Sequence, residues 1–313
     1  MEHILKAQQF SNREDLDKIF EATDWIRKNP NPLFFKNSGY IMATMFYEPS
    51  TRTRFSFETA MKKLGGGVLS TENAEEFSST AKGEVLEDSI RTVSVYADVI
   101  VLRHHIEGAA ERAAEVSDVP IINAGDGAGQ HPTQALLDLY TIQRECGSID
   151  GKTIALIGDL AHSRTIHSLA YLLSNYDIKK LYLVSPEFVK MKKEIIYHLA
   201  EHNITIEITS ELAKIAPEVD VFYQTRLQKE RFLASDFQMY QKYHKQNEFR
   251  IDAELLKLMK PEARILHPLP RVGEILHEVD SDPRAAYFRQ VKNGLYLRMA
   301  LLVMLLNGRY IIK

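Results

Sequence analysis

The sequence has little cysteine and no excess of positive charge, which rules out several classes of protein. Its 313 residues include one cysteine, Cys146, so an internal disulfide cannot form, and no Cys/His cluster has the spacing of a zinc site. The net charge of -3 argues against a protein that coats nucleic acid or an anionic membrane, because such proteins carry a basic surplus. We therefore expect a reducing compartment, no metal and no nucleic-acid partner.

Long apolar runs and nucleotide-binding motifs are also missing. Residues 1–15 turn polar too soon for a signal peptide. The most apolar stretch, 295–306, contains Arg298 and falls well short of the ~20 residues that a membrane span needs. Gly158 and Asp159 follow an apolar run as in a dinucleotide fold, but neither G-x-G-x-x-G nor a Walker A sequence occurs. We expect a cytoplasmic protein with no membrane partner and no cofactor.

The sequence does contain a regular alternation of strand and helix patterns. Ser11 and Glu14 have the spacing of a capping box, which predicts a helix start at Ser11. Apolar runs of strand length follow at 40–46, 68–70, 98–102 and 120–123 and, after a break at 147–151, at 153–157, 180–184, 204–208, 219–223 and 264–267. Strands this continuously apolar are typical of parallel sheets covered by helices on both faces. Because the chain is also longer than one core usually organises, the pattern predicts an α/β protein of two domains.

Unusual polar residues follow these strands, at the edge where open α/β sheets bind ligands. They lie at 50–54, 103–104, 125–134, 158–165, 224–226 and 267–271. Ser50, Thr51, Arg52 and Thr53 combine a helix start with hydroxyls and a guanidinium, which suits a phosphate. In isolation such a run is more often an N-cap serine followed by solvent-facing arginines. The buried strand before it favours the anion site.

A histidine and a glutamine flank Pro132. Because proline suits the first turn of a helix, His131 and Gln134 are predicted at a helix entrance beside a glycine-rich loop, where they can reach a small ligand. Taken alone, a capping histidine and an exposed glutamine would be the commoner explanation. His104 and Cys146 have no supporting pattern, and we interpret them as ordinary structural or surface residues.

Three long motifs occur in one order, at residues 46–58, 130–134 and 267–271. Together they strongly resemble the catalytic chains of the aspartate carbamoyltransferase family, over essentially the whole length. The resemblance implies two α/β domains, each a mostly parallel sheet flanked by helices, with the active site in the cleft between them. Residues 1–139 and 289–313 would bind carbamoyl phosphate, and residues 140–288 would bind L-aspartate. It also implies a homotrimer in which a loop of the neighbouring subunit completes each site.

The resemblance assigns roles to matching residues. For carbamoyl phosphate it implies Ser50, Thr51, Arg52, Thr53, Ser78, Lys82, Arg103, His131, Gln134, Pro268 and Leu269. For L-aspartate it implies Lys82, Arg164, Thr165, Arg226, Gln228 and Leu269. The catalytic residues would be Arg52, Thr53, Lys82, Arg103 and His131, with Ser78 and Lys82 supplied by the neighbour. We expect the departing phosphate to accept the amine proton, so that His131 is a ligand of the carbonyl oxygen rather than a base.

Two alternatives fit parts of the sequence. Ornithine carbamoyltransferase shares the phosphate-binding run, but it typically has cysteine where Pro268 stands and must bind a cationic amino acid, whereas residues 224–231 are basic. A catalytically silent homologue would have lost main ligands such as Arg52 or His131, and both are present. The sequence therefore favours an active enzyme whose acceptor is L-aspartate.

Some positions depart from the family pattern. Gly273 stands where an acidic residue is expected, and Ala81 and the pair Ala161 and His162 also differ. These departures leave the matching catalytic ligands intact, but they prevent any inference about cooperative regulation. Whether a regulatory chain or another pyrimidine-pathway enzyme, such as a dihydroorotase, binds this chain stays open.

Overall fold

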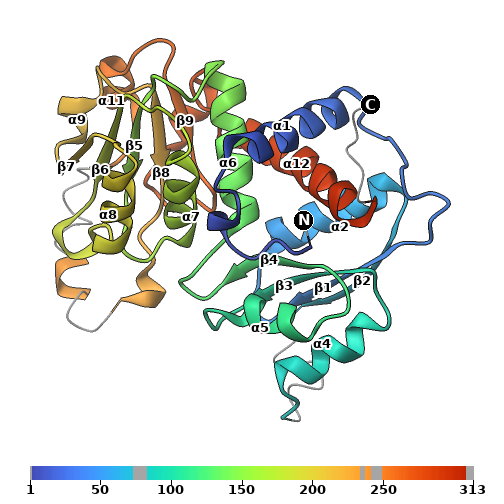
Figure 1. Ribbon diagram of the computed structural model, residues 1–313. Coiled ribbons are helices and arrows are strands. Elements are labelled where there is room, and N and C mark those ends of the chain that lie inside the picture. Colours follow the sequence, from blue (N-terminus) through green and yellow to red (C-terminus); the bar gives the residue numbers. More distant parts are fainter. Residues whose placement is uncertain (1, 73–82, 233–236, 241–248, 308–313) are drawn as a thin grey trace. The chain divides into compact units, whose positions relative to one another are not determined.

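The computed structural model describes residues 2–72, 83–232, 237–240 and 249–307, and the chain forms two compact units (Figure 1). The first unit comprises Met1–Leu137 with Lys292–Lys313, and the second comprises Asp138–Val291. The chain passes from one to the other within two helices, α6 (Pro132–Cys146) and α12 (Tyr287–Asn307). The domain limits expected from the sequence lie between residues 139 and 140 and between 288 and 289. These limits stay predictions, as does the substrate assigned to each domain.

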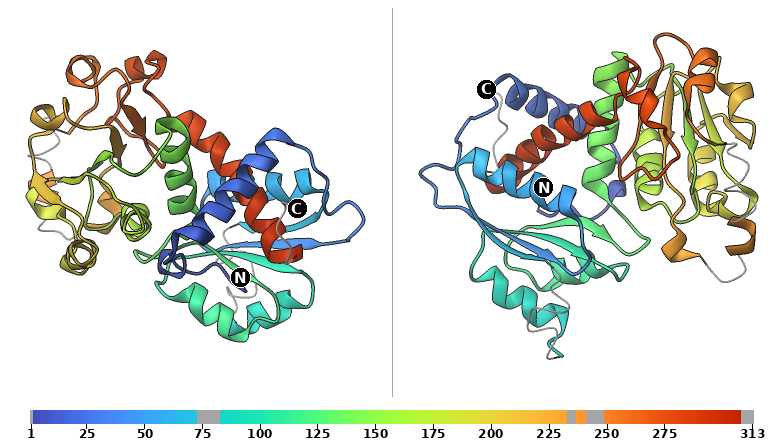
Figure 2. Two further views of the ribbon diagram at one scale, coloured as in Figure 1. Left: turned by 45° about the horizontal axis from the view of Figure 1, so that its top comes forward. Right: turned by 180° about the vertical axis from the view of Figure 1, so that it is seen from behind.

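The first unit is built on a four-stranded parallel sheet of order β2-β1-β3-β4. Its elements are η1 (Ala7–Gln9), α1 (Arg13–Lys28), β1 (Ile41–Phe46), α2 (Thr51–Leu64), β2 (Gly67–Glu72), α4 (Leu86–Ser94), β3 (Val99–His104), α5 (Ala109–Val116) and β4 (Ile121–Asp126). Helices α4 and α5 cover one face of the sheet, and α1, α2 and α12 cover the other (Figures 1 and 2). Ala43, Met45 and Ile100 pack against Leu86 and Ile90 of α4 in the core of the first face.

The second unit is built on a five-stranded parallel sheet of order β7-β6-β5-β8-β9. Its elements are β5 (Thr153–Ile157), α7 (Arg164–Leu173), β6 (Lys180–Val184), η3 (Glu187–Val189), α8 (Lys193–Glu201), β7 (Ile206–Thr209), α9 (Leu212–Ile215), β8 (Val221–Gln224), η4 (Lys229–Arg231), α11 (Ala253–Leu258), β9 (Arg264–Leu266) and η5 (His277–Ser281). Ala155, Ile157 and Phe222 of the sheet pack with Leu212 of α9 and Leu255 of α11 in one buried cluster.

Each apolar run singled out in the sequence overlaps a strand to within one or two residues at its start, and every pairing between these strands is parallel. The prediction of an α/β fold with two parallel sheets is therefore confirmed. Strands β3 and β4 extend past their apolar residues, to His104 and Asp126. Their polar ends are buried as well, so an apolar pattern alone ends these strands too early.

The predicted start of the first long helix is wrong by one residue. Asn12, rather than Ser11, caps α1, because its side-chain Oδ1 accepts a hydrogen bond from the backbone N–H of Asp15 at 2.8 Å. Both residue types are good helix caps.

Among the residues that the structure describes, no helix is long and apolar enough to cross a membrane.

Candidate active site

The carboxyl ends of neighbouring strands bring the first group of predicted ligands to one edge of the first sheet. Phe46 at the end of β1 pairs with Arg103 of β3, and Leu102 pairs with Asn123 of β4. The segments after β1 and β4 therefore leave the sheet at the same edge, which is where open α/β sheets bind ligands. The first segment leads to the run at 50–53, and the second leads to His131.

The start of α2 is suited to an anion. Ser50 is the N-cap residue, but its side chain makes no capping hydrogen bond, and the first turn contains no acidic residue. The N–H groups of a first helical turn have no partner inside the helix, and the helix dipole favours negative charge there. Thr53 is buried, whereas Thr51 and Arg52 are exposed. A helix start of this kind favours an anion such as a phosphate.

Arg103 lies beside this helix start in a mainly buried position. Its Nη1 donates to the carbonyl oxygen of Ala124 at 3.2 Å, and its Nη2 lies 3.2 Å from the Glu48 carboxylate. These contacts orient the guanidinium. His104, the next residue, is buried and accepts the N–H of Ile106 at 3.0 Å, so it is structural, and burial lowers its pKa to about 4.

His131 and Gln134 lie at the entrance of α6, as the sequence predicts, and both are buried. The preceding loop is held by the carboxylate of Asp126, which accepts from the N–H groups of Gly108 at 2.9 Å and Gln130 at 3.0 Å. The side-chain amide of Asn123 donates to the same carboxylate at 3.0 Å. Asp126 therefore fixes the path of the chain into His131.

The second group of predicted ligands lies at the carboxyl edge of the second sheet. Arg164 and Thr165 begin α7 after β5, and Arg164 is buried. The Asp159 carboxylate accepts from the backbone N–H of His162 at 2.9 Å and from that of Gln228 at 3.1 Å. Because Gln228 follows β8, this one buried carboxylate joins the loops that carry the predicted aspartate ligands.

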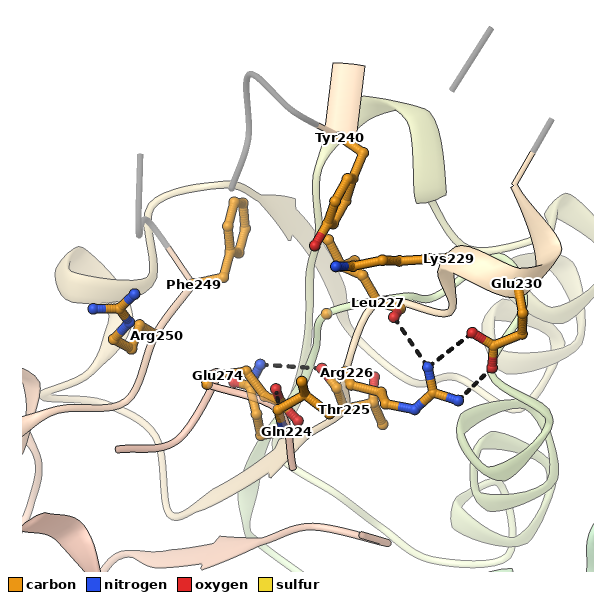
Figure 3. Close-up of a pocket in the computed structure, with 13 residues that line it drawn as sticks. Gln224, Thr225, Arg226, Leu227, Lys229, Glu230, Tyr240, Phe249, Arg250 and Glu274 are labelled. Carbon is orange, nitrogen blue, oxygen red and sulfur yellow. Dashed lines mark hydrogen bonds and ion pairs between the residues drawn. The ribbon is translucent and has the colours of Figure 1, made fainter. Parts of the chain in front are cut away.

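Arg226 is held in an ion pair with Glu230. Its Nη1 donates to Glu230 Oε2 at 3.0 Å, and its Nη2 bonds to Oε1, so the two groups meet fork to fork and the pKa of Arg226 rises. Both residues line a cavity of about 240 Å³, together with Gln224, Lys229 and Glu274 (Figure 3). Arg226 thus already holds one carboxylate, that of Glu230, by the paired hydrogen bonds that are typical of a guanidinium.

Gly273, one of the departures from the family pattern, lines the same cavity at a backbone conformation that favours glycine. Its φ of +105° is a conformation that L side chains rarely adopt, although no heavy atom lies within 4 Å of the position a Cβ would take. Glycine is therefore favoured by the backbone rather than by crowding. Gly158 also has a positive φ, of +110°, but here crowding requires glycine as well. A Cβ added to Gly158 would lie 2.2 Å from the carbonyl oxygen of Thr225.

Pro268 and Leu269 follow β9, whose Leu266 pairs with Tyr223 of β8. They therefore lie at the same edge as the segment that contains Arg226. Ser78 and Lys82 lie outside the described residues. Among the residues that are described, no cluster of His, Cys, Asp and Glu side chains could hold a metal ion.

Sequence reasoning missed the carboxylates that hold these ligands in place: Glu48, Asp126, Asp159, Glu230 and Glu274. One of them had a signal in the sequence. Glu230 is four residues after Arg226, the spacing of a helical ion pair. The others accept backbone N–H groups or bind residues distant in the sequence, which no local spacing reveals.

Comparisons with known proteins place these observations in one family. Residues 2–144 match the carbamoyl-phosphate-binding domain of aspartate/ornithine carbamoyltransferases, and residues 150–305 match the Asp/Orn-binding domain. Aspartate carbamoyltransferase 1 of Pisum sativum, a chloroplastic protein, is 55% identical over 311 residues, which cover 98% of this chain and 79% of the pea protein.

Two solved structures are similar over nearly the full chain. The catalytic subunit of M. jannaschii aspartate transcarbamoylase superposes with a TM-score of 0.89 at 46% identity and covers 99% of both chains. The Trypanosoma cruzi enzyme in complex with carbamoyl phosphate and aspartate has a TM-score of 0.91 at 43% identity, covering 96% of this chain and 95% of that one.

Proposed function

Because the chain belongs to the aspartate/ornithine carbamoyltransferase family, we infer that it transfers the carbamoyl group of carbamoyl phosphate to the amino group of L-aspartate. The products are N-carbamoyl-L-aspartate and phosphate, and the reaction is an early step of de novo pyrimidine (UMP) synthesis. The observation that carries this function is the open start of α2, where Ser50, Thr51, Arg52 and Thr53 lie at the same sheet edge as Arg103.

The residues at this edge suit carbamoyl phosphate. We propose that the run at 50–53 and Arg103 bind the phosphate oxygens and that Gln134 contacts the carbamoyl amide. Thr53, Arg103 and His131 would surround the carbonyl oxygen, which gains negative charge as the amine attacks. Donors fixed in advance at such an oxygen are usually the largest source of rate acceleration. The contacts of Arg103 with Glu48 and Ala124 supply that fixed geometry.

The second group of ligands suits a dicarboxylate. We propose that Arg164 and Arg226 bind the two carboxylates of L-aspartate, because a planar guanidinium can hold a carboxylate by two parallel hydrogen bonds. Thr165, Gln228 and the main chain at Pro268 and Leu269 would complete the pocket. Ornithine, whose side chain is cationic, would find like charges in the same place.

The mechanism needs no protein nucleophile. The neutral amine of L-aspartate attacks the carbamoyl carbon, a C–N bond forms, the C–O bond to phosphate breaks, and the departing phosphate accepts the amine proton. The protein supplies orientation, which can account for several kcal/mol of barrier reduction, roughly 7–11 in well-oriented reactions. His131, buried at the start of α6, would act by donating to the carbonyl oxygen.

The activity test uses carbamoyl phosphate with either L-aspartate or L-ornithine and measures carbamoyl-aspartate and citrulline. Carbamoyl-aspartate is the expected product, and Arg52→Ala should lower kcat/KM by about 10²-fold or more, as loss of a transition-state donor does. The matched control is Arg91→Ala, which removes an exposed guanidinium from α4 that pairs with Asp88 at 3.3 Å and should leave kcat/KM unchanged. Dominant citrulline would overturn the choice of acceptor, and calorimetric binding of carbamoyl phosphate without turnover would indicate a silent homologue.

We also propose that the active unit is a homotrimer in which Ser78 and Lys82 of one subunit complete the site of the next. The test mixes inactive Lys82→Ala chains with inactive Arg52→Ala chains after dissociation, then reassembles them. Because some mixed interfaces would contain neither substitution, activity should return. Each variant reassembled alone is the control, and a mixture that stays inactive would contradict sharing.

A cytoplasmic location stays a prediction, since the pea relative is chloroplastic.

A further inference from the structure

The segment His267-Pro268-Leu269-Pro270 has an unusual shortage of hydrogen-bond donors. Proline has no backbone N–H, so among residues 268–270 Leu269 alone can donate. Leu269 also has φ +56°, the left-handed region that leucine rarely adopts. Its N–H donates to Nδ1 of His267 at 2.7 Å. This bond is therefore the one backbone donor contact available to hold these three residues in their conformation.

The bond determines which nitrogen of His267 carries the proton. An Nδ1 that accepts a hydrogen bond is unprotonated, so in the neutral imidazole the ring proton lies on Nε2. Nε2 is 2.7 Å from Oε1 of Glu274, and the imidazole is almost fully buried. The carboxylate of Glu274 thus accepts the Nε2 proton and selects the tautomer in which Nδ1 can accept from Leu269.

Both partners of this contact are themselves fixed. The second oxygen of Glu274, Oε2, accepts the N–H of Val272 at 2.9 Å. Although burial raises the pKa of Glu274, the hydrogen bonds from His267 and Val272 hold it below its usual value, so the group is a carboxylate near neutral pH. The backbone N–H of His267 donates to Oε1 of Gln290 at 2.9 Å. A rigid frame of this kind transmits the placement of Glu274 to Leu269.

We propose that Glu274 is a positioning residue that acts through the His267 imidazole to hold the backbone of Leu269 where it meets the substrates. The inference rests on the proposed function, in which the main chain at Leu269 helps to complete the pocket for L-aspartate. Without the carboxylate, the imidazole can take the Nδ1–H tautomer. The ring proton and the Leu269 N–H would then point at each other, and Leu269 would leave its position.

The test is a double-mutant cycle measured on the full-length chain with both substrates. Glu274→Ala should lower kcat/KM for L-aspartate about tenfold, within the range found for residues of one hydrogen-bond network. Glu274→Gln keeps one acceptor and should fall between Ala and the original chain. In His267→Asn the amide Oδ1 can replace Nδ1 as acceptor and has no tautomer to select. Adding Glu274→Ala to His267→Asn should therefore change kcat/KM less than about twofold.

The control is Glu278→Ala, which also removes a carboxylate that accepts a backbone N–H, that of Ala253 at 2.8 Å. Because Glu278 is exposed, this change should lower the thermal midpoint less than Glu274→Ala does, and it should leave kcat/KM unchanged. Losses that multiply in the double variant, or a Glu274→Ala enzyme with unchanged kcat/KM, would overturn the proposal.

A second readout needs no activity and separates this inference from the function itself. Imidazole ¹⁵N shifts of His267 should be pyridine-type at Nδ1 and pyrrole-type at Nε2 in the original chain, and should move toward a mixture of both in Glu274→Ala. An unchanged tautomer in that variant would refute the role of Glu274. If the original chain made no carbamoyl-aspartate, the proposed function would fail instead, whatever the shifts showed.

Discussion

Buried carboxylates hold the backbone around both groups of candidate ligands. Asp126 accepts N–H groups ahead of His131, and Asp159 accepts the N–H of Gln228. A carboxylate has two acceptor oxygens and no donor, so it can accept backbone N–H groups from two loops at once. Neither residue is among the predicted substrate ligands. They act by limiting where the ligand side chains can lie.

Residue type and position in the sequence indicated the ligands but not these supports. Arg103 could be singled out because it follows an apolar run, whereas its partner Glu48 could not, because the pairing depends on the packing of β1 against β3. The same holds for Asp159 and Gln228, which meet only because β5 and β8 are neighbours in the sheet. A carboxylate that accepts from a distant backbone leaves no spacing to recognise.

One buried residue beside the candidate site should be replaceable with a gain in stability. Gln224 is fully buried; its Nε2 donates to Thr225 O at 3.3 Å, and its Oε1 has no hydrogen-bond partner within the described part of the chain. An unpaired buried acceptor costs about 1–3 kcal/mol. Gln224→Met should therefore raise the free energy of unfolding, measured in urea, by about 1 kcal/mol.

The matched control for that change is Gln290→Met, also buried. The amide of Gln290 is fully used, since its Nε2 donates to Asp138 Oδ1 at 2.6 Å and its Oε1 accepts from His267 N. Loss of both bonds should lower the free energy of unfolding by about 2–4 kcal/mol, because the Asp138 carboxylate loses a donor and the buried N–H of His267 loses its acceptor. Equal destabilisation by the two substitutions would contradict the role assigned to the unpaired Oε1 of Gln224.

At the scale of elements, the strands were more predictable than the helix ends. Apolar runs located each strand of the described residues, but the first long helix begins one residue later than the Ser11 and Glu14 spacing predicts. Ser11 and Asn12 are both suitable caps, so the local pattern could not choose between them. Burial of Leu16 and Ile19 selects the orientation of α1, and Asn12 is the residue that then reaches the free N–H of Asp15.

An ion pair joins Arg271, in the loop after β9, to Asp280 of η5 and should make stability depend on pH in the acid range. Asp280 of η5 bonds to Arg271, with Nη2 to Oδ2 at 2.6 Å, and also accepts from the hydroxyl of Tyr287. These bonds, with that from Arg271 the largest influence, lower the pKa of Asp280 from 3.8 to about 2. Its stabilising effect is therefore complete above the unfolded pKa and is lost as pH falls through the folded pKa.

We predict that Asp280→Asn lowers the free energy of unfolding by about 1 kcal/mol near neutral pH. The effect is this small because the carboxylate is partly exposed and water screens its charge. The difference between the original chain and the variant should shrink as the pH falls from about 4 toward 2. Urea unfolding of both chains over this range measures it. A difference that stays constant with pH would show that the carboxylate charge is not responsible.

At the scale of the whole molecule, two parallel sheets with two cores were predictable from length and from the alternation of strand and helix patterns. The order of the strands was not. Periodicity identifies a strand but contains no information on its neighbours. In the order β2-β1-β3-β4 the consecutive strands β2 and β3 are not neighbours, and in β7-β6-β5-β8-β9 the same is true of β7 and β8. That order is what brings Arg103 next to the end of β1 and Leu266 next to β8.

The sequence by itself determined the fold class, the strands and the residue types at their carboxyl ends, because periodicity and composition are local properties of the chain. Only the tertiary structure decided which of those residues meet and what holds them. The segment that begins at His267 shows both. Its prolines and histidine mark it in the sequence, but the contacts of the imidazole with Glu274 and of Gln290 with His267 arise where separate segments pack together. Hydrogen bonds between distant residues depend on that packing, and no spacing along the chain encodes them.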